Sequence, residues 1–177
     1  MRALVVYESM FGNTKAVANA VADGLATRMP VDVVEVGTAP PVVGDDVALL
    51  VVGGPTHAFG MSRPGTRRDA GKQAEHGLVS AGIGLREWLT AVHEGSGGVA
   101  ATAFDTRIDR PRLPGSAARA AEKRLRRLGF RTIAAPESFY VAGTQGPLLD
   151  GELERARRWG DELGAKATGQ VLGAFSG

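Results

Sequence analysis

Short apolar runs alternate along this chain with segments in which apolar residues recur every three or four positions. The runs Ala3–Tyr7 and Val47–Val52 contain almost no polar residue, as expected of strands buried on both faces. Between Val17 and Leu25, small and apolar side chains recur at the spacing of a single helix face. This alternation of strand and helix patterns predicts a parallel sheet with helices on both faces.

The complete pattern predicts five strands and four helices. The strands are expected at Ala3–Tyr7, Val31–Val36, Val47–Val52, Val99–Phe104 and Arg131–Val141. Charges in the second strand and Pro136 in the fifth suit sheet edges. The helices are expected at Lys15–Thr27, along a stripe from Leu85 to Val92, between a Ser116 cap and a Gly129 stop, and from Gly151 along Leu153, Ala156, Gly160, Leu163 and Ala167, with fraying from Gly169.

Right-handed crossovers restrict how these elements can be arranged. The order of the elements fits one α/β domain over residues 1–177, with a doubly wound five-stranded parallel sheet in the order 2-1-3-4-5. In such a sheet, the carboxyl ends of the first, third and fourth strands meet at a crevice. Ligands of open parallel sheets bind at that position, so the loops after these three strands are the candidate site.

The loop between the first strand and the first helix is rich in short polar residues and contains a glycine. Ser9, Asn13 and Thr14 supply hydroxyl and amide groups, and Gly12 lets the backbone approach a ligand closely. Unpaired N–H groups and the positive end of the helix dipole can hold an anion there. An ordinary turn capped by Asn13 or Thr14 would need only one such side chain.

Other phosphate-binding motifs do not fit this loop. It lacks the Gly-Lys-Ser/Thr ending of a P-loop and the Gly-x-Gly-x-x-Gly of dinucleotide-binding folds. No lysine stands where a triphosphate would need one. The loop therefore predicts a ligand with a single phosphate group.

The residues Tyr7-x-Ser9-x-x-Gly12-Asn13-Thr14-x-x-x-Ala18-x-x-Val21 resemble the flavodoxin signature at each of its fixed positions. The resemblance implies FMN as the cofactor and electron transfer as the function. Flavodoxin itself is a standard example of a cofactor bound at the switch point of a doubly wound sheet. By position, the implied cofactor-binding residues are Ser9, Met10, Phe11, Gly12, Asn13 and Thr14 at the phosphate, Pro55, Thr56, His57, Ala58, Phe59 and Gly60 along one side of the ring, and Asp105, Thr106 and Arg107 along the other.

Several of these residues have an alternative interpretation. Phe59 could stack on the ring or fill a core position under the loop. His57 could titrate near the flavin, because the ordinary pKa of histidine is suitable. Asp105 follows a strand and could contact the ligand or cap the next turn.

The chain departs from flavodoxins in its aromatic residues. Flavodoxins commonly place the ring between two aromatics, whereas only Phe59 is present in the second loop and none in the third. Tyr140 falls inside the fifth strand and Trp88 on the inner stripe of a helix, so neither is a simple replacement. We therefore expect weaker FMN binding than in a typical carrier, or stacking by Arg107 instead.

Composition narrows the functional classes. The chain has no cysteine, so disulfides, thiol redox chemistry and cysteine metal sites are excluded, and redox activity would need a bound cofactor. No apolar run approaches the roughly 20 residues that cross a bilayer. The first strand pattern begins at once and leaves no signal peptide, so we expect a cytoplasmic protein with no membrane partner.

Charge is the second departure from flavodoxins, which are typically acidic. The net charge is +2 and the sequence pI is about 9.3. The segment Gly60–Gly82, predicted to be a long loop, carries Arg63, Arg67, Arg68 and Lys72. These residues either form a solvated surface or meet an anionic partner, namely an acidic redox protein or the phosphate of NAD(P)H.

The remaining basic clusters favour no ligand. Lys123, Arg124, Arg126 and Arg127 lie near a helix carboxyl terminus, where positive charge complements the dipole. The clusters belong to separate elements and lack an exposed aromatic platform, so nucleic-acid binding is not expected.

Three functions remain open on the sequence. The first is an FMN-binding electron carrier without a substrate pocket of its own. The second is an FMN-dependent NAD(P)H oxidoreductase of the quinone-reductase type on the same fold, and the third is a flavin-free binding protein. A phosphorylated receiver domain has a similar sheet but needs an acidic cluster at the strand ends, which Glu8 alone does not supply.

Overall fold

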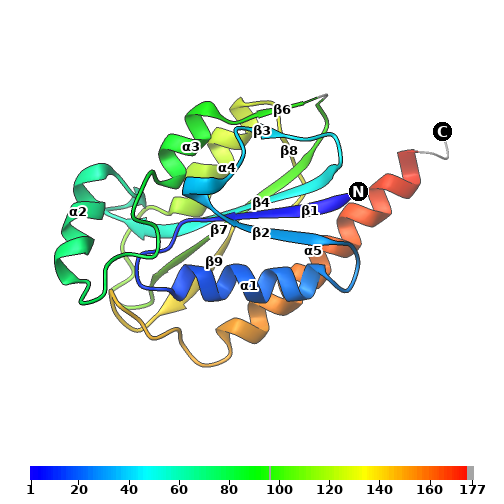
Figure 1. Cartoon of the computed structure of the whole chain (residues 1–177). Helices are drawn as coiled ribbons and strands as arrows, with labels where there is room; N and C mark the ends of the chain where they lie inside the picture. The colour runs from blue at the N-terminus through cyan, green and yellow to red at the C-terminus, as the bar shows by residue number, and fades with distance from the viewer. Residues whose placement is uncertain (96, 175–177) are drawn as a thin grey trace.

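The structure, a computed structural model, describes residues 1–95 and 97–174. Its strands are β1 Arg2–Tyr7, β2 Val31–Glu35, β3 Val42–Val43, β4 Val47–His57, β5 Gly60–Met61, β6 His93–Glu94, β7 Ala100–Ile108, β8 Arg131–Thr132 and β9 Glu137–Val141. The main sheet has the order β2-β1-β4-β7, and both β8 and β9 pair with β7. All these pairings are parallel, so the predicted order of five strands is confirmed, with the fifth strand in two pieces (Figure 1).

Helices cover both faces of the sheet. They are α1 Asn13–Leu25, α2 Pro64–Gln73, α3 Leu85–Ala91, α4 Ala117–Arg127 and α5 Glu152–Ala174, with a 3-10 turn, η1, at Val36–Thr38. Figure 1 shows α1 and α5 on one face and α3 and α4 on the other. The short α2 lies at the end of the sheet where the strands terminate.

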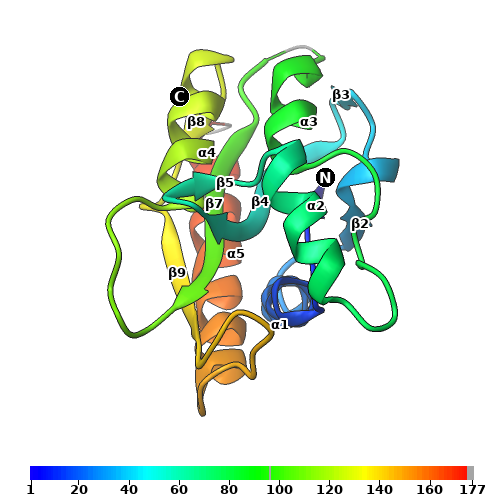
Figure 2. The ribbon, with the colours of Figure 1, turned by 90° about the vertical axis from the view of Figure 1, so that its left-hand side faces the viewer.

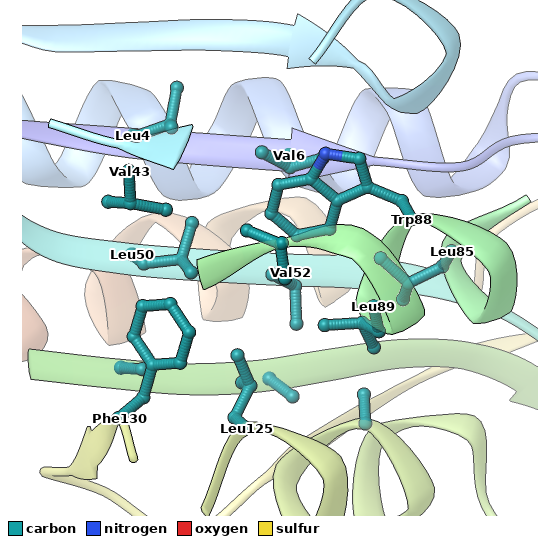
Figure 3. Packing of buried hydrophobic residues seen from close by; sticks show 14 of the residues in the cluster. Leu4, Val6, Val43, Leu50, Val52, Leu85, Trp88, Leu89, Leu125 and Phe130 are labelled. Atoms are coloured by element: carbon teal, nitrogen blue, oxygen red, sulfur yellow. The ribbon is translucent and has the colours of Figure 1, made fainter. Parts of the chain in front are cut away.

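The core forms because successive residues of each buried strand point to opposite faces. Leu4 and Val6 of β1 pack with α3 and α4, in the cluster that Figure 3 shows around Trp88. Ala3 and Val5 of the same strand pack with α1 and α5. Both faces of β1 and β4 are therefore apolar, which explains why their sequences contain continuous hydrophobic runs.

Helix α1 is held against α5 by direct contact between their backbones. A Cβ atom at Gly160 would lie 2.1 Å from the carbonyl oxygen of Val21, and one at Gly24 would lie 2.0 Å from that of Arg157. Only glycine permits this approach, because real Cβ contacts are never so short. The crossing fixes α1, and therefore the position of its amino terminus at the end of β1.

The two central strands extend further than predicted. β4 continues from Val52 to His57, and β7 continues from Phe104 to Ile108. The two extensions pair with each other at Gly54↔Asp105 and Pro55↔Thr106, and β9 covers the other side of β7. The positions Gly53–His57 and Asp105–Arg107, expected in the loops after the third and fourth strands, are therefore strand, because they pair with neighbouring strands.

The largest error of the sequence prediction concerns Gly60–Gly82, which was expected to be one long loop. It contains β5, which returns antiparallel to β4, and the helix α2. The helix has few apolar residues, and only Arg67 and Ala70 are buried, so it leaves no hydrophobic stripe in the sequence.

Several element ends also differ from prediction. The cap of α1 is Gly12 in a left-handed conformation, rather than Asn13 or Thr14. Leu153, expected on the inner stripe of α5, is 46% exposed. The same helix continues to Ala174, past the expected fraying at Gly169. The Ser116 cap of α4 is confirmed, since its side chain accepts a hydrogen bond from the N–H of Arg119.

Candidate functional site

A cavity of about 280 Å³ lies at the carboxyl ends of β1, β4 and β7, the predicted position of the crevice. Figure 2 shows this end of the sheet, with α2 beside the amino terminus of α1. The lining includes eleven of the predicted site residues: Ser9, Met10, Phe11, Asn13, Thr14, Pro55, Thr56, His57, Ala58, Thr106 and Arg107. The other four predicted residues, Gly12, Phe59, Gly60 and Asp105, are not part of the lining.

The loop after β1 presents backbone N–H groups to this cavity. Gly12 has φ +97°, a conformation that suits glycine, and donates its N–H to Ser9 Oγ at 3.1 Å. In the described part of the chain, no acceptor is found for the N–H groups of Met10, Phe11 and residues 13–15. Free amides at the amino terminus of a helix form an anion site.

Other segments hold this loop in place. The N–H groups of Val79 and Ser80 donate to the carbonyl oxygens of Met10 and Ser9, at 3.0 and 2.8 Å. The N–H of Ser9 in turn donates to Ser80 Oγ at 3.0 Å. These three hydrogen bonds therefore attach the loop to the segment between α2 and α3.

Side chains of the loop reach across the cavity to other elements. The hydroxyl groups of Thr14 and Thr106 lie 2.6 Å apart, which joins the loop to the end of β7. The amide of Asn13 donates to the carbonyl oxygen of Gln145 at 3.1 Å, and the amide of Gln145 donates to the carbonyl oxygen of Gln73 at 3.1 Å. These bonds connect α1, α2 and the segment after β9 around the opening.

The end of β4 forms one wall of the cavity. Burial and the nearby charge of Arg67 lower the pKa of His57, so its imidazole stays neutral at pH 7. After His57, a two-residue turn leads back into β5, with His57 paired to Gly60. Phe59 lies at the tip of this turn and is 58% exposed, so it fills neither the core nor the cavity.

The end of β7 forms the opposite wall. Arg107 lines the cavity, and its guanidinium donates to the carbonyl oxygen of Leu113. Asp105 is fully buried below this wall. Its Oδ2 accepts hydrogen bonds from Thr56 Oγ1, Ser116 Oγ and the N–H of Ala118, at 2.9, 2.5 and 3.0 Å. The structure therefore uses Asp105 at the start of α4, which was the alternative interpretation of this residue.

Helix α2 supplies lining residues that the sequence prediction missed. Its cavity-facing positions are Thr66, Asp69, Ala70 and Gln73, a spacing of three, four and seven residues. Ile108, Val141 and Thr144 complete the lining that had not been predicted. One signal for α2 was present, because Pro64 occupies the first helical position and favours a helix start.

A buried polar network fixes α2 beside the site. Glu8 accepts hydrogen bonds from Ser62 Oγ and from the N–H of Leu85, the latter at 2.7 Å. Arg67 donates to Ser62 Oγ at 2.8 Å and to a carboxylate oxygen of Glu87 at 3.0 Å. Burial raises the pKa of Glu8, although the hydrogen bonds and the charge of Arg67 oppose this effect.

Comparison with known proteins bears on the fold. No protein-family model matches the sequence, and no curated protein matches it. An archaeal flavodoxin is 21% identical, with a TM-score of 0.65 over 95% of this chain and 99% of its own. Flavodoxin 1 from Bacillus cereus is 14% identical, with a TM-score of 0.63 over 95% of this chain and 97% of its own. The chain has the flavodoxin fold. Its cavity lies at the switch point where this fold places ligands.

The flavodoxin fold also occurs as part of larger proteins. A flavodiiron protein from Giardia intestinalis is 19% identical, with a TM-score of 0.57, over 95% of this chain but 36% of its own length. Among the described residues of this chain, no cluster of three His, Asp or Glu side chains could hold a metal ion. None of the described helices has the length and hydrophobicity needed to cross a membrane.

Proposed function

We propose that this protein binds FMN and carries single electrons between redox partners. The observation that carries the proposal is the set of free N–H groups at residues 10, 11, 13 and 14, all of which line a cavity at the switch point of a flavodoxin fold. A single phosphate matches these donors, because no lysine or arginine lies in the loop before Lys15.

Side chains of the loop can add to the phosphate site. Ser9 Oγ accepts from Gly12, so its own hydroxyl hydrogen is free to donate. Thr14 can likewise donate to the phosphate when Thr106 donates to it, since each hydroxyl has one donor and two acceptor positions. The bonds already present therefore leave the hydroxyl hydrogens of Ser9 and Thr14 available to a phosphate.

The walls of the cavity suit the ring of a flavin. The cavity lining includes Pro55, Thr56 and Ala58 from the end of β4 and the turn after it, and Thr106 and Ile108 from the end of β7, so apolar groups and strand backbone are both available to a ring. When bound, FMN would supply the electron-accepting group that a chain without cysteine lacks. A cavity of about 280 Å³ is small for a nucleotide, so part of the ligand would remain at the surface.

The proposal predicts a difference between FMN and riboflavin, which lacks the phosphate. Thr14→Val and Ser9→Ala should each lower FMN affinity about tenfold, the loss expected for one hydrogen bond to a charged group. Riboflavin affinity should change much less. Fluorescence titration of both ligands measures the two affinities, and Thr132→Val in β8, far from the cavity, is a matched control.

Two outcomes would contradict the proposal. If the protein quenched neither FMN nor riboflavin fluorescence, only a flavin-free role would remain. If the FMN-loaded protein oxidised NADPH rapidly with a quinone and no added reductase, it would be an NAD(P)H oxidoreductase rather than a carrier.

A further inference from the structure

The turn between β4 and β5 carries an exposed aromatic residue on a strained backbone. Ala58 and Phe59 have φ angles of +40° and +76°, which cost about 1–2 kcal/mol for each residue with a side chain. The pairing of His57 with Gly60 holds the turn from one side. Strain of this kind is retained where the surrounding structure imposes it and is typical of functional positions.

The segment after β7 supports the turn from the other side. A Cβ atom at Gly115 would lie 2.0 Å from the carbonyl oxygen of Phe59, so the two backbones touch. Two residues earlier, Leu113 is 54% exposed, and its carbonyl oxygen is bound by Arg107. Phe59 and Leu113 are thus two large apolar side chains presented to solvent by neighbouring segments.

These two segments are strongly basic. Residues 58–72 and 107–115 contain seven of the 21 basic residues of the chain and two of its 19 acidic residues. The rest of the chain has 14 basic and 17 acidic residues, so the excess of positive charge belongs to these two segments. Glu75 and Asp150, also at this end of the sheet, belong to the segments after α2 and before α5.

Four of these seven basic side chains have an ion-pair partner, and among them Arg67 pairs with Glu87 and Lys72 with Asp69. Arg110 and Arg112 share one carboxylate, that of Asp109, at 3.6 and 3.5 Å. Arg63 and Arg68 have no ion-pair partner in residues 1–95 and 97–174. The surface around Phe59 therefore combines an apolar centre with a basic rim, an arrangement found at protein interfaces.

We propose that Phe59, Leu113, Arg63, Arg68, Arg110 and Arg112 form the docking surface for an acidic redox protein. The inference rests on the proposed electron-transfer function and names its partner. His57 and Ala58 line the cavity and precede Phe59 directly, so a protein seated on this surface lies against the cavity wall. Opposite charge steers such a partner to the surface, and the apolar centre excludes water after contact.

The test uses an acidic plant-type ferredoxin as the probe. Backbone amide NMR spectra of the full chain, recorded during titration with ferredoxin, should change at residues 58–63 and 107–115. The changes should weaken as salt is raised toward about 0.3 M, because screening shortens the range of the attraction. This readout needs no flavin, so it is independent of the FMN titration.

Matched variants distinguish the effect of charge at the proposed docking surface from the effect of the net charge of the whole chain. The double variant Arg63→Glu and Arg68→Glu should lower ferredoxin affinity roughly tenfold. The double variant Lys123→Glu and Arg127→Glu makes the same change in net charge at the far end of α4, and it should have little effect. Phe59→Ala should weaken binding without changing its salt dependence.

Other results would overturn the inference. Equal losses in both charge variants would show that only net charge matters. Tighter binding of duplex DNA at the same amides would make this a nucleic-acid surface. A chain that binds FMN but not ferredoxin would lose this inference alone, whereas failure of the FMN titration would remove the proposed function itself.

Discussion

At the scale of single residues, the strained turn makes a prediction about stability. Ala58 and Phe59 occupy positions that glycine adopts at no steric cost. Phe59→Gly should therefore stabilise the fold by about 1 kcal/mol and raise the melting temperature by roughly 2–4 °C. Thermal unfolding checks this, and a loss of stability would mean that the phenyl ring contributes more packing than its exposure indicates.

A substitution at the neighbouring residue distinguishes the effect of backbone strain from the effect of the phenyl ring. Ala58→Gly should give a similar gain in stability while leaving Phe59 in place. Ferredoxin binding should then be retained in Ala58→Gly and reduced in Phe59→Gly. This result would show that ferredoxin binding depends on the phenyl ring of Phe59, and that the strained backbone of the turn costs folding free energy without contributing to binding by itself.

Two carboxyl groups near Arg67 should affect stability in opposite directions as pH changes. Burial raises the pKa of Glu8 above its ordinary 4.5, so the folded state binds more protons than the unfolded state. The contribution of Glu8 to the free energy of unfolding is fully present below pH 4.5 and is lost as pH rises through the folded-state pKa. Glu8→Gln should remove this loss, so the variant gains stability relative to the native chain as pH rises.

Glu87 provides the matched control for that experiment. Burial favours a higher pKa for Glu87, but the hydrogen bond and the charge of Arg67 hold its pKa below the ordinary value. Its contribution is present above pH 4.5 and is lost as pH falls. Urea unfolding of Glu8→Gln and Glu87→Gln between about pH 3 and 8 should give stability differences of opposite slope, with the change for Glu87 below pH 4.5. Slopes of the same sign would contradict this assignment of the two groups.

The sequence predicted individual residues well where one local motif determined them. Ser9, Asn13 and Thr14 could be placed because the strand, loop and helix that position them are contiguous. Asp105 and Phe59 could not, because their surroundings depend on how far β4 and β7 continue. That extent is set by pairing between strands about 50 residues apart, which no local pattern records.

At the scale of elements, the crossing of α1 and α5 has a measurable consequence. In Gly160→Ala, the new methyl group would meet the Val21 carbonyl oxygen at 2.1 Å, and a backbone atom cannot rotate away. We expect a loss of about 1–3 kcal/mol, which exceeds the gain in helix propensity of about 1 kcal/mol. FMN affinity should fall as well, because α1 carries the phosphate loop at its amino terminus.

The same helix provides the control. At Gly169 of α5, no atom lies within 4 Å of an added Cβ, so Gly169→Ala should stabilise by up to about 1 kcal/mol. Denaturant unfolding of the two variants compares the same substitution in the same helix. Equal effects at both positions would show that the crossing is loose enough to accept a methyl group.

Element prediction failed mainly at α2. The helices α1, α3 and α4 have apolar stripes because each packs on the sheet. Helix α2 lies beyond the sheet end and is held by Arg67 and by the Gln145–Gln73 hydrogen bond, so its sequence is polar throughout. Polar contacts of this kind leave no periodic signal, although Pro64 marks the start of the helix.

At the scale of the whole molecule, the topology followed from the sequence because the alternation of strands and helices allows few arrangements. Right-handed crossovers and burial of both sheet faces allow more than one doubly wound order, and the flavodoxin-like signature favoured 2-1-3-4-5, which is the order that the structure has. The distribution of charge over the surface was harder to predict from the sequence. Basic residues far apart in the sequence meet at one end only after α2 and the segment after β7 are placed.

The division of the fifth strand also affects how the molecule behaves among its own copies. Ile133 still donates its N–H to the carbonyl oxygen of Ala101 in β7, but the chain leaves the ladder at residues 134–136 before β9, and Pro136 has no N–H to donate. An extended segment from another molecule would find no continuous row of donors and acceptors along this side. The interruption thus makes this edge of the sheet a poor template for pairing with an edge strand of another copy of the protein.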